Sequence, residues 1–147
     1  FNTTLGLENA SLAISQSLRK DNLTFAAEGN DPDAMFSLGM FHLDQRQPQP
    51  ALEWLKKAAG KKHAEAIEAL GEEYISGSFG EPDFEEGAKW LKQASSQGSL
   101  PAQTRLGSLA LTGKLPGTKP AGAIRWFRLA AEEGHAEAQT RLGGLLW

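Results

Sequence analysis

The sequence contains no cysteine. A disulfide framework, a thiolate nucleophile and a cysteine-bound zinc site are therefore excluded. No apolar run approaches the roughly 20 residues that a membrane-spanning helix needs, so we expect no membrane insertion. Basic residues are not in excess, since 15 Lys and Arg stand against 18 Asp and Glu, a formal net charge of −3. This balance gives no reason to expect nucleic acid as a partner.

Motifs of several enzyme classes are also missing. Neither Gly-x-Ser-x-Gly nor His-Glu-x-x-His occurs, and no glycine-rich loop follows a predicted strand. We therefore expect no catalytic residue and no cofactor, and a protein that is not an enzyme.

A repeat is what the sequence does contain. Tryptophan recurs every 36 residues, at Trp54, Trp90 and Trp126. Each tryptophan is followed 16 residues later by the leucine of a Leu-Gly pair, and one such pair precedes them all. The four pairs stand at residues 38–39, 70–71, 106–107 and 142–143. Self-similarity at this period is typical of helical solenoids.

Apolar periodicity and helix-ending glycines predict two helices in each repeat and no sheet. The predicted helices cover approximately residues 8–28, 32–44, 64–76, 84–98, 100–112, 121–133 and 136–147, and one further helix begins at 51 and includes Trp54. Asp31 and Asp83 are placed to cap the helices that follow them, and residues 45–50, with two prolines, are predicted to be a loop. The predicted fold is all-α, an α/α superhelical solenoid of about three and a half repeats.

The same register predicts a single repeat domain over residues 1–147. Its parts are an N-terminal capping helix in residues 1–30, repeats in 31–62, 63–98 and 99–134, and a C-terminal capping helix in 135–147. In the N-terminal helix Leu7, Ile14, Leu18 and Phe25 share one face, and we expect this helix to cover the open side of the first repeat.

The recurring residues have mechanical interpretations. Glycine inside a helix costs about 1 kcal/mol relative to alanine. Its recurrence at one phase, at Gly39, Gly71, Gly107 and Gly143, predicts close contact with a neighbouring helix. The tryptophans are predicted to be large core side chains, and the alternative is that they contact a ligand.

The three histidines do not form a metal-binding pattern. His63 and His135 each begin the motif His-Ala-Glu-Ala, in repeats that are not adjacent. His42 occupies the position in the first repeat that Tyr74 occupies in the second. Equivalent residues of non-adjacent repeats lie too far apart to share an ion, so we expect no metal site.

The sequence motifs of the repeat resemble those of a known family. Ala-x-x-Trp-x-x-x-Ala-Ala begins at Ala123, Gly-His-Ala-Glu-Ala begins at Gly134, and Leu-Gly follows at 142–143. Together they resemble the Sel-one-like repeat, a relative of the tetratricopeptide repeat. The match is strongest in 123–143, good in 64–98 and weaker in 31–62, with departures at Gly87 and Ser95.

This resemblance implies an antiparallel helical superhelix whose groove is lined by the first helix of each repeat. It also implies a protein–protein adaptor or scaffold, mostly bacterial and often exported. Two alternatives follow from the same family: an immunity protein that neutralises a secretion-system effector, and a β-lactam binder or hydrolase.

One predicted helix carries a candidate binding face. Residues 63–98 hold eight acidic residues against Lys89 and Lys92, whereas residues 99–134 have a net charge of +3. Glu65, Glu68 and Glu72 fall at positions i, i+3 and i+7, on one face of a helix. By analogy with the tetratricopeptide layout, this face points into the groove.

The corresponding positions of the other repeats complete the candidate partner-binding set. They are Asp33, Phe36 and Met40 in the first repeat, Thr104 and Ser108 in the third, and Thr140 in the last helix. A mixed acidic and apolar surface favours a partner protein with a basic and apolar segment. The alternative is an ordinary solvated helix face.

Overall fold

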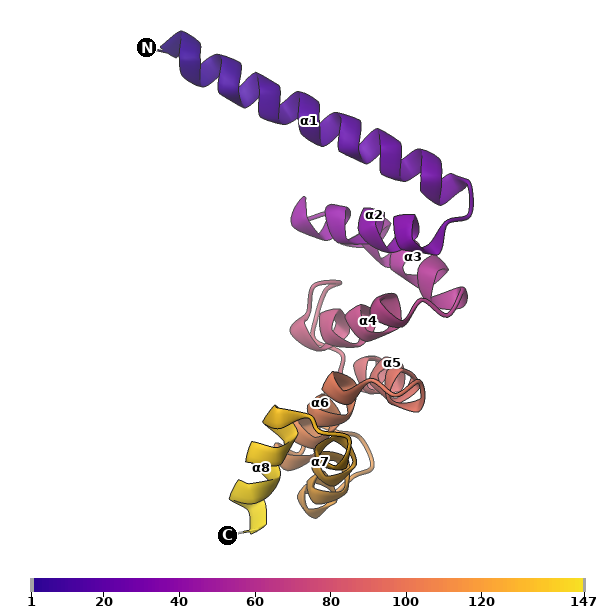
Figure 1. The fold of residues 1–147 in the computed structure, drawn as a ribbon, viewed down its shortest axis with the longest axis vertical. Coiled ribbons are helices and arrows are strands. Elements are labelled where there is room, and N and C mark those ends of the chain that lie inside the picture. The colour runs from indigo at the N-terminus through magenta and orange to yellow at the C-terminus, as the bar shows by residue number, and fades with distance from the viewer. Residues whose placement is uncertain (1, 147) are drawn as a thin grey trace. The chain divides into compact units, whose positions relative to one another are not determined.

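The computed structural model describes residues 2–146, with side chains from residue 6 onward. Within that range the chain forms eight α-helices and no strand (Figure 1). The all-α fold expected from the repeat is therefore confirmed.

The helices follow one another in antiparallel pairs joined by short turns. They are α1 (Asn2–Glu28), α2 (Pro32–Asp44), α3 (Pro48–Gly60), α4 (Ala64–Ser76), α5 (Phe84–Ser96), α6 (Leu100–Leu111), α7 (Ala123–Glu132) and α8 (Ala136–Leu146), with a 3-10 turn η1 (Pro120–Gly122) before α7. No helix in the described part is long and apolar enough to cross a bilayer.

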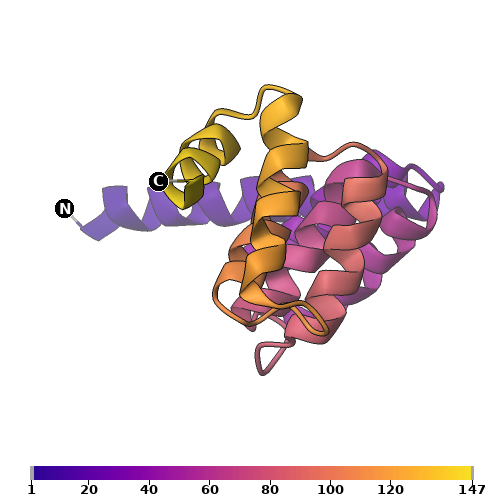
Figure 2. The same ribbon diagram turned by 90° about the horizontal axis from the view of Figure 1, so that it is seen from below.

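The chain divides into two compact units, residues 1–63 and 64–147. The first unit contains α1 to α3, and the second contains α4 to α8. Consecutive helices of the second unit pack side by side (Figures 1 and 2). The division into one repeat domain with an end helix at each terminus stays a prediction, and its outermost residues, Phe1 and Trp147, lie outside the described part.

Local sequence explains where the helices begin. The Asp31 carboxylate accepts a hydrogen bond from the Asp33 backbone N–H at 3.0 Å, and Asp83 accepts one from Glu86 at 3.0 Å. These bonds satisfy donors that the first helical turn leaves unpaired, so both predicted caps are confirmed. Ser99 caps α6 in the same way through the Ala102 N–H.

The predicted loop over residues 45–50 is wrong in its length. Helix α3 already begins at Pro48, so Pro48 and Pro50 both lie in its first turn. Proline is tolerated there because the first helical N–H groups have no partner within the helix, and its fixed φ suits the helix. The two prolines therefore start the helix instead of extending the loop.

The Leu-Gly pairs make the close helix contacts that their phase predicts. A Cβ atom placed on Gly39 would lie 2.8 Å from Leu55 Cγ, and one on Gly71 would lie 2.7 Å from Leu91 Cγ. In the third repeat a Cβ on Gly107 would meet the Phe127 ring at 2.7 Å. Within each of these repeats, glycine therefore lets the first helix approach the second.

The last pair differs from the other three. A Cβ on Gly143 would meet no atom within 4 Å. Helix α8 is a first helix with no second helix after it in the described residues, so its glycine faces no packing partner. The predicted close contact is therefore confirmed at three of the four positions and wrong at Gly143.

The tryptophans are not the main core side chains, and that expectation is wrong. Trp54, Trp90 and Trp126 are each partly exposed. The residues that immediately follow them, Leu55, Leu91 and Phe127, are each 0% exposed. One residue turns the helix face by about 100°, which is enough to move the packing direction from the tryptophan to its neighbour.

Helix α1 packs on α2 only through its C-terminal part. Ala27 is buried and Leu23 and Ala26 are partly buried, whereas residues 6–22 are exposed. The helix runs well past the end of α2 (Figure 1). Contact with the first repeat is therefore present, but the apolar stripe predicted on α1 takes no part in it.

Candidate functional site

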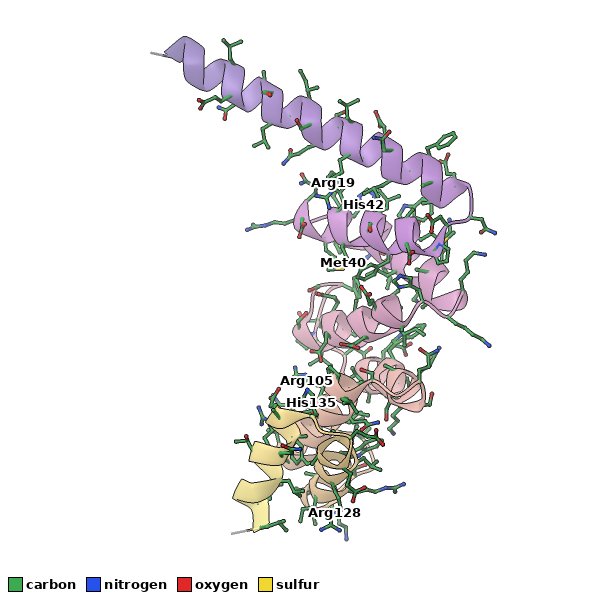
Figure 3. The ribbon with its side chains drawn as sticks, viewed as in Figure 1. Arg19, Met40, His42, Arg105, Arg128 and His135 are labelled. Carbon is green, nitrogen blue, oxygen red and sulfur yellow. The ribbon has the colours of Figure 1, made fainter. Side chains whose placement is uncertain are left out.

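The first unit presents its candidate residues on α2. Asp33 is exposed, and its carboxylate lies 2.9 Å from His63 Nε2. The Phe36 ring stacks on the His63 imidazole, with ring centroids 5.0 Å apart. Met40 is partly exposed on the same helix (Figure 3). Two of the three candidates thus contact one residue, which directly precedes α4.

In the second unit the acidic face of α4 is anchored at two of its three positions. Glu65 is exposed. The Glu68 carboxylate accepts a hydrogen bond from the Ser99 hydroxyl at 2.8 Å. The Glu72 carboxylate accepts one from Arg105 Nε at 3.1 Å. Helix α6 and its N-cap residue Ser99 thus bond two of the three carboxylates of α4.

The candidates on α6 and α8 are mostly engaged within the chain. Thr104 is 3% exposed, and its hydroxyl lies 2.9 Å from His135 Nδ1. The Ser108 hydroxyl donates to the Thr104 carbonyl at 3.2 Å, and the exposed Thr140 donates to the Ala136 carbonyl at 3.1 Å. Because Thr104 is buried against His135, its side chain is not available on the surface to a partner.

These interactions follow the repeat and define a recurring junction contact. A residue in the middle of each first helix meets the residue just before the next first helix. The pairs are Phe36 with His63, Glu68 with Ser99, and Thr104 with His135. One position in the register therefore meets the residue that precedes the next first helix, by stacking in the first unit and by a hydrogen bond at the two places in the second unit.

Sequence reasoning missed the second member of each junction contact. His63, Ser99 and His135 stand 36 residues apart, so the repeat period contained the signal. Ser99 differs in type from the two histidines, so residue identity alone does not reveal the shared position. Arg105 was missed as well, since a charge pair between neighbouring repeats leaves no short-range pattern.

The pKa of the Glu72 carboxyl is shifted from its ordinary value. Burial raises the pKa of its carboxyl above the ordinary value of 4.5, and the charges of Glu68 and Glu73 act in the same direction. Arg105 opposes this rise by its charge and its hydrogen bond, but it does not cancel it. Burial therefore removes water from the Glu72 carboxylate, and the interaction with Arg105 replaces that hydration only in part.

A pH-dependent effect on stability follows. Because the folded pKa of Glu72 is raised, its contribution to stability is full below about pH 4.5 and is lost as pH rises through the folded pKa. Glu72→Gln removes this titration while keeping a hydrogen-bond acceptor for Arg105. In urea denaturation, the free energy of unfolding of the variant relative to wild type should increase between pH 3.5 and pH 7. A difference that falls over this interval would contradict the assigned direction.

Two open clefts of the second unit are bordered by candidate residues. One of about 300 Å³ is bordered by Glu68, Ser99 and Pro101, at a junction contact. The other, of about 380 Å³, is lined by Arg105 and Ser108 together with the apolar Ile75 and Phe84. Lys114 also borders it and lies 5.1 Å from the centre of the Phe84 ring. The acidic face of α4 is thus followed by a cleft with cationic and apolar walls.

The histidines have individual partners. His63 contacts Asp33, His135 contacts Thr104, and His42 Nδ1 lies 2.7 Å from Gln47 Oε1. Figure 3 shows His42 on α2 and His135 close to the start of α8. Among the described residues there is no group of three His, Asp or Glu side chains that could hold a metal ion.

Paired antiparallel helices, a repeated Leu-Gly contact and a repeated junction contact define a helical repeat protein. The Sel1 repeat matches three times, over residues 32–63, 64–99 and 100–135. The chain therefore belongs to the Sel1 repeat family, as the resemblance predicted. Proteins of this family generally act as protein–protein interaction modules, and the family is a non-catalytic scaffold family.

Solved structures with the same fold agree with this assignment. One is c5321, a protective antigen present in uropathogenic Escherichia coli strains with an SLR fold, at 30% identity and a TM-score of 0.75. A Sel1 repeat protein from Oxalobacter formigenes matches at 27% identity and a TM-score of 0.69. The matches cover 85% and 84% of this chain, and 28% and 96% of those proteins, respectively. No match was found among the curated proteins.

Proposed function

We propose that this chain binds a protein partner through the first-helix face of its repeats, and that the partner segment is basic and apolar. The observation that carries the proposal is the acidic face of α4, where Glu65, Glu68 and Glu72 lie within two turns. Asp33, Phe36 and Met40 are the register equivalents of these residues on α2 of the first unit, where they offer an acidic and two apolar side chains.

The state of the carboxylates supports a cationic partner. Glu65 is exposed, and the raised pKa of Glu72 reports a charge that Arg105 only partly compensates. A lysine or arginine of a partner would add the missing compensation and lower the pKa of Glu72. Charge of this kind accelerates association and fixes register, while apolar contacts supply most of the affinity.

The cleft lined by Arg105 and Ser108 supports the proposal that the partner segment is extended. Its cationic walls, Arg105 and Lys114, adjoin an acidic face, so a segment lying along both would carry a basic part and an acidic or neutral part. Ser108, one of the candidate residues, lines this cleft, and Thr140 on α8 is the outermost candidate. The immunity and hydrolase alternatives remain implications of the resemblance, because no observation on the described residues favours either.

Peptide selection tests the proposal without a known partner. Short random peptides displayed on phage are selected against the immobilised chain and then counter-selected against the variant Glu65→Gln/Glu68→Gln. We expect the surviving peptides to combine Lys or Arg with Leu, Ile or Phe. Selection of acidic peptides, or of peptides that bind the variant equally well, would overturn the basic and apolar assignment.

Removing charge from α4 should slow association with a selected peptide. Glu65→Gln/Glu68→Gln keeps side-chain length and leaves an acceptor for Ser99, so the fold should be retained. The association rate at low salt should fall about ten-fold, and its dependence on salt should flatten. Stopped-flow fluorescence or surface plasmon resonance over a series of salt concentrations measures both effects.

The matched control removes the same charge elsewhere. Glu85 and Glu86 lie in the first turn of α5, a second helix, outside the proposed surface. Glu85→Gln/Glu86→Gln should leave the association rate within about two-fold of wild type. If this control slows association more than the α4 variant does, the binding surface lies on the second helices and the assignment fails.

A further inference from the structure

Helix α1 carries a long apolar stripe that the rest of its unit leaves uncovered. Leu7, Ile14, Leu18 and Phe25 are 68%, 61%, 59% and 82% exposed. Residues seven and eleven apart return to nearly the same side of a helix, so the four form one stripe. Ala27, which is buried toward α2, is turned by about 200° from Phe25. The stripe therefore faces away from α2.

Stacking of repeats does not cover this side of the helix. In repeat register α1 takes the place of a second helix, and Phe25 corresponds to Lys57, Gln93 and Leu129, all of which are exposed. The position that packs against the first helix of the same repeat corresponds instead to Leu23. Figure 3 shows Arg19 on the side of α1 that faces α2. A further repeat is therefore a poor candidate for covering the stripe.

The spacing of the stripe is symmetric about residue 16. Leu7 and Phe25 each lie nine residues from that point, and Ile14 and Leu18 each lie two residues from it. Two copies of α1 packed antiparallel about a two-fold axis at this point would place Leu7 against Phe25 and Ile14 against Leu18. A surface of this kind is self-complementary, which is what an isologous dimer requires.

The polar residues of the stripe obey the same symmetry. Ser11 and Asp21 occupy the two remaining positions of the seam, five residues on either side of the centre, and both are exposed. In the antiparallel arrangement the Ser11 hydroxyl of one copy meets the Asp21 carboxylate of the other, a donor facing an acceptor. No like charges face each other in the seam, since Asp21 pairs with a hydroxyl and not with a second carboxylate.

The seam is long enough for a stable helix pair. Residues 7 to 25 span about 27 Å at 1.5 Å per residue, and the pairing gives six layers, or about three heptads. With roughly 60–120 Å² for each Leu or Ile and 150–250 Å² for Phe, two copies would bury about 1,000 Å². This lies near the lower limit of specific interfaces, so we expect a weak dimer, with a dissociation constant on the order of micromolar as at the weak end of the range for interfaces of standard size.

We infer that α1 is a dimerisation helix, and that a second copy of this chain packs antiparallel on Leu7, Ile14, Leu18 and Phe25. A membrane surface is the competing occupant. Charge argues against it, because Arg19 and Lys20 on α1 are outnumbered by three acidic residues, whereas surface-bound amphipathic helices are rich in Lys and Arg.

Sedimentation equilibrium of the 147-residue chain tests self-association. Wild type should show a monomer–dimer equilibrium at micromolar concentration, and Leu18→Glu should weaken the dimer at least about ten-fold, because symmetry places the new charge in the seam twice. The matched control is Leu12→Glu. Leu12 is 58% exposed on α1 but lies outside the stripe, so this change should alter the dissociation constant less than about two-fold.

Cross-linking tests the antiparallel register, and the absence of native cysteine makes single thiols unambiguous. Ser11→Cys and Asp21→Cys proteins, oxidised after mixing, should form a disulfide-linked heterodimer. Neither should link to itself, because Ser11 and its symmetry mate lie about 15 Å apart along the axis, well beyond disulfide reach.

Three results would overturn the inference. Wild type could remain monomeric to the highest measurable concentration, including the case in which it instead co-sediments with phosphatidylserine vesicles. Leu12→Glu could dissociate the dimer as much as Leu18→Glu. Ser11→Cys could link efficiently to itself, which would mean a parallel pair. Peptide binding by α4 is measured separately, so failure here leaves the proposed function untouched.

Discussion

Phe127→Ala is expected to lower the free energy of unfolding by about 3–5 kcal/mol, the cost of a large cavity in a packed core. The Phe127 side chain is fully buried on α7, and its ring fills the space that Gly107 leaves on α6. Alanine would remove the ring from both helices at once. Urea denaturation followed by circular dichroism measures the loss.

Leu129 is the control on the same helix. It is 41% exposed, so Leu129→Ala should cost no more than about 1 kcal/mol. If Phe127→Ala cost less than about 1 kcal/mol, the third repeat would not depend on the packing of α6 against α7.

Two glycine substitutions at the same phase of the repeat should have opposite effects. Gly107→Ala places a methyl group 2.7–2.9 Å from three atoms of the Phe127 ring, and a ring cannot yield as the end of a flexible side chain can. We expect a net loss of about 1–3 kcal/mol in the free energy of unfolding. Gly143→Ala meets nothing within 4 Å and should instead gain up to about 1 kcal/mol from helix propensity.

Both variants are measured by the same denaturation experiment, so the comparison does not depend on an absolute scale. Equal losses in the two proteins would mean that glycine at this phase serves the backbone and not the approach of two helices. Equal gains would mean that Phe127 moves aside at little cost.

The fold was predictable because its signals repeat. The tryptophan period, the Leu-Gly pairs and the caps Asp31 and Asp83 located the helices of the repeats to within a few residues, whereas α1 begins at Asn2, before its predicted start at residue 8. The side chain that packs against the first helix was not predictable, because Trp126 and Phe127 are adjacent in the sequence and both are large and apolar. Only the geometry shows that the glycine of α6 faces the second of them.

The candidate surface was predictable only in part. The spacing of Glu65, Glu68 and Glu72 correctly places them on one helix, since that is a local property of the chain. That Ser99 holds Glu68 and Arg105 holds Glu72 depends on how α6 lies against α4. Such contacts between repeats join residues about 30 positions apart in the sequence. A local sequence pattern cannot predict which residues pair at that separation.

The turns that lead into each first helix allow one backbone shape to arise from different residues. Asn30 and Lys62 have φ values of 80° and 62°, and their register equivalents Gly98 and Gly134 have 90° and 91°. A residue with a side chain is strained in this left-handed conformation but restricts the unfolded chain, whereas glycine is unstrained but leaves that chain freer. The strain of about 1–2 kcal/mol exceeds the gain of about 0.4–1 kcal/mol from a less free unfolded chain. The first unit therefore keeps the same turn as the second at a net cost in stability, and that cost is smaller at Asn30 than at Lys62 because Asn tolerates the left-handed region.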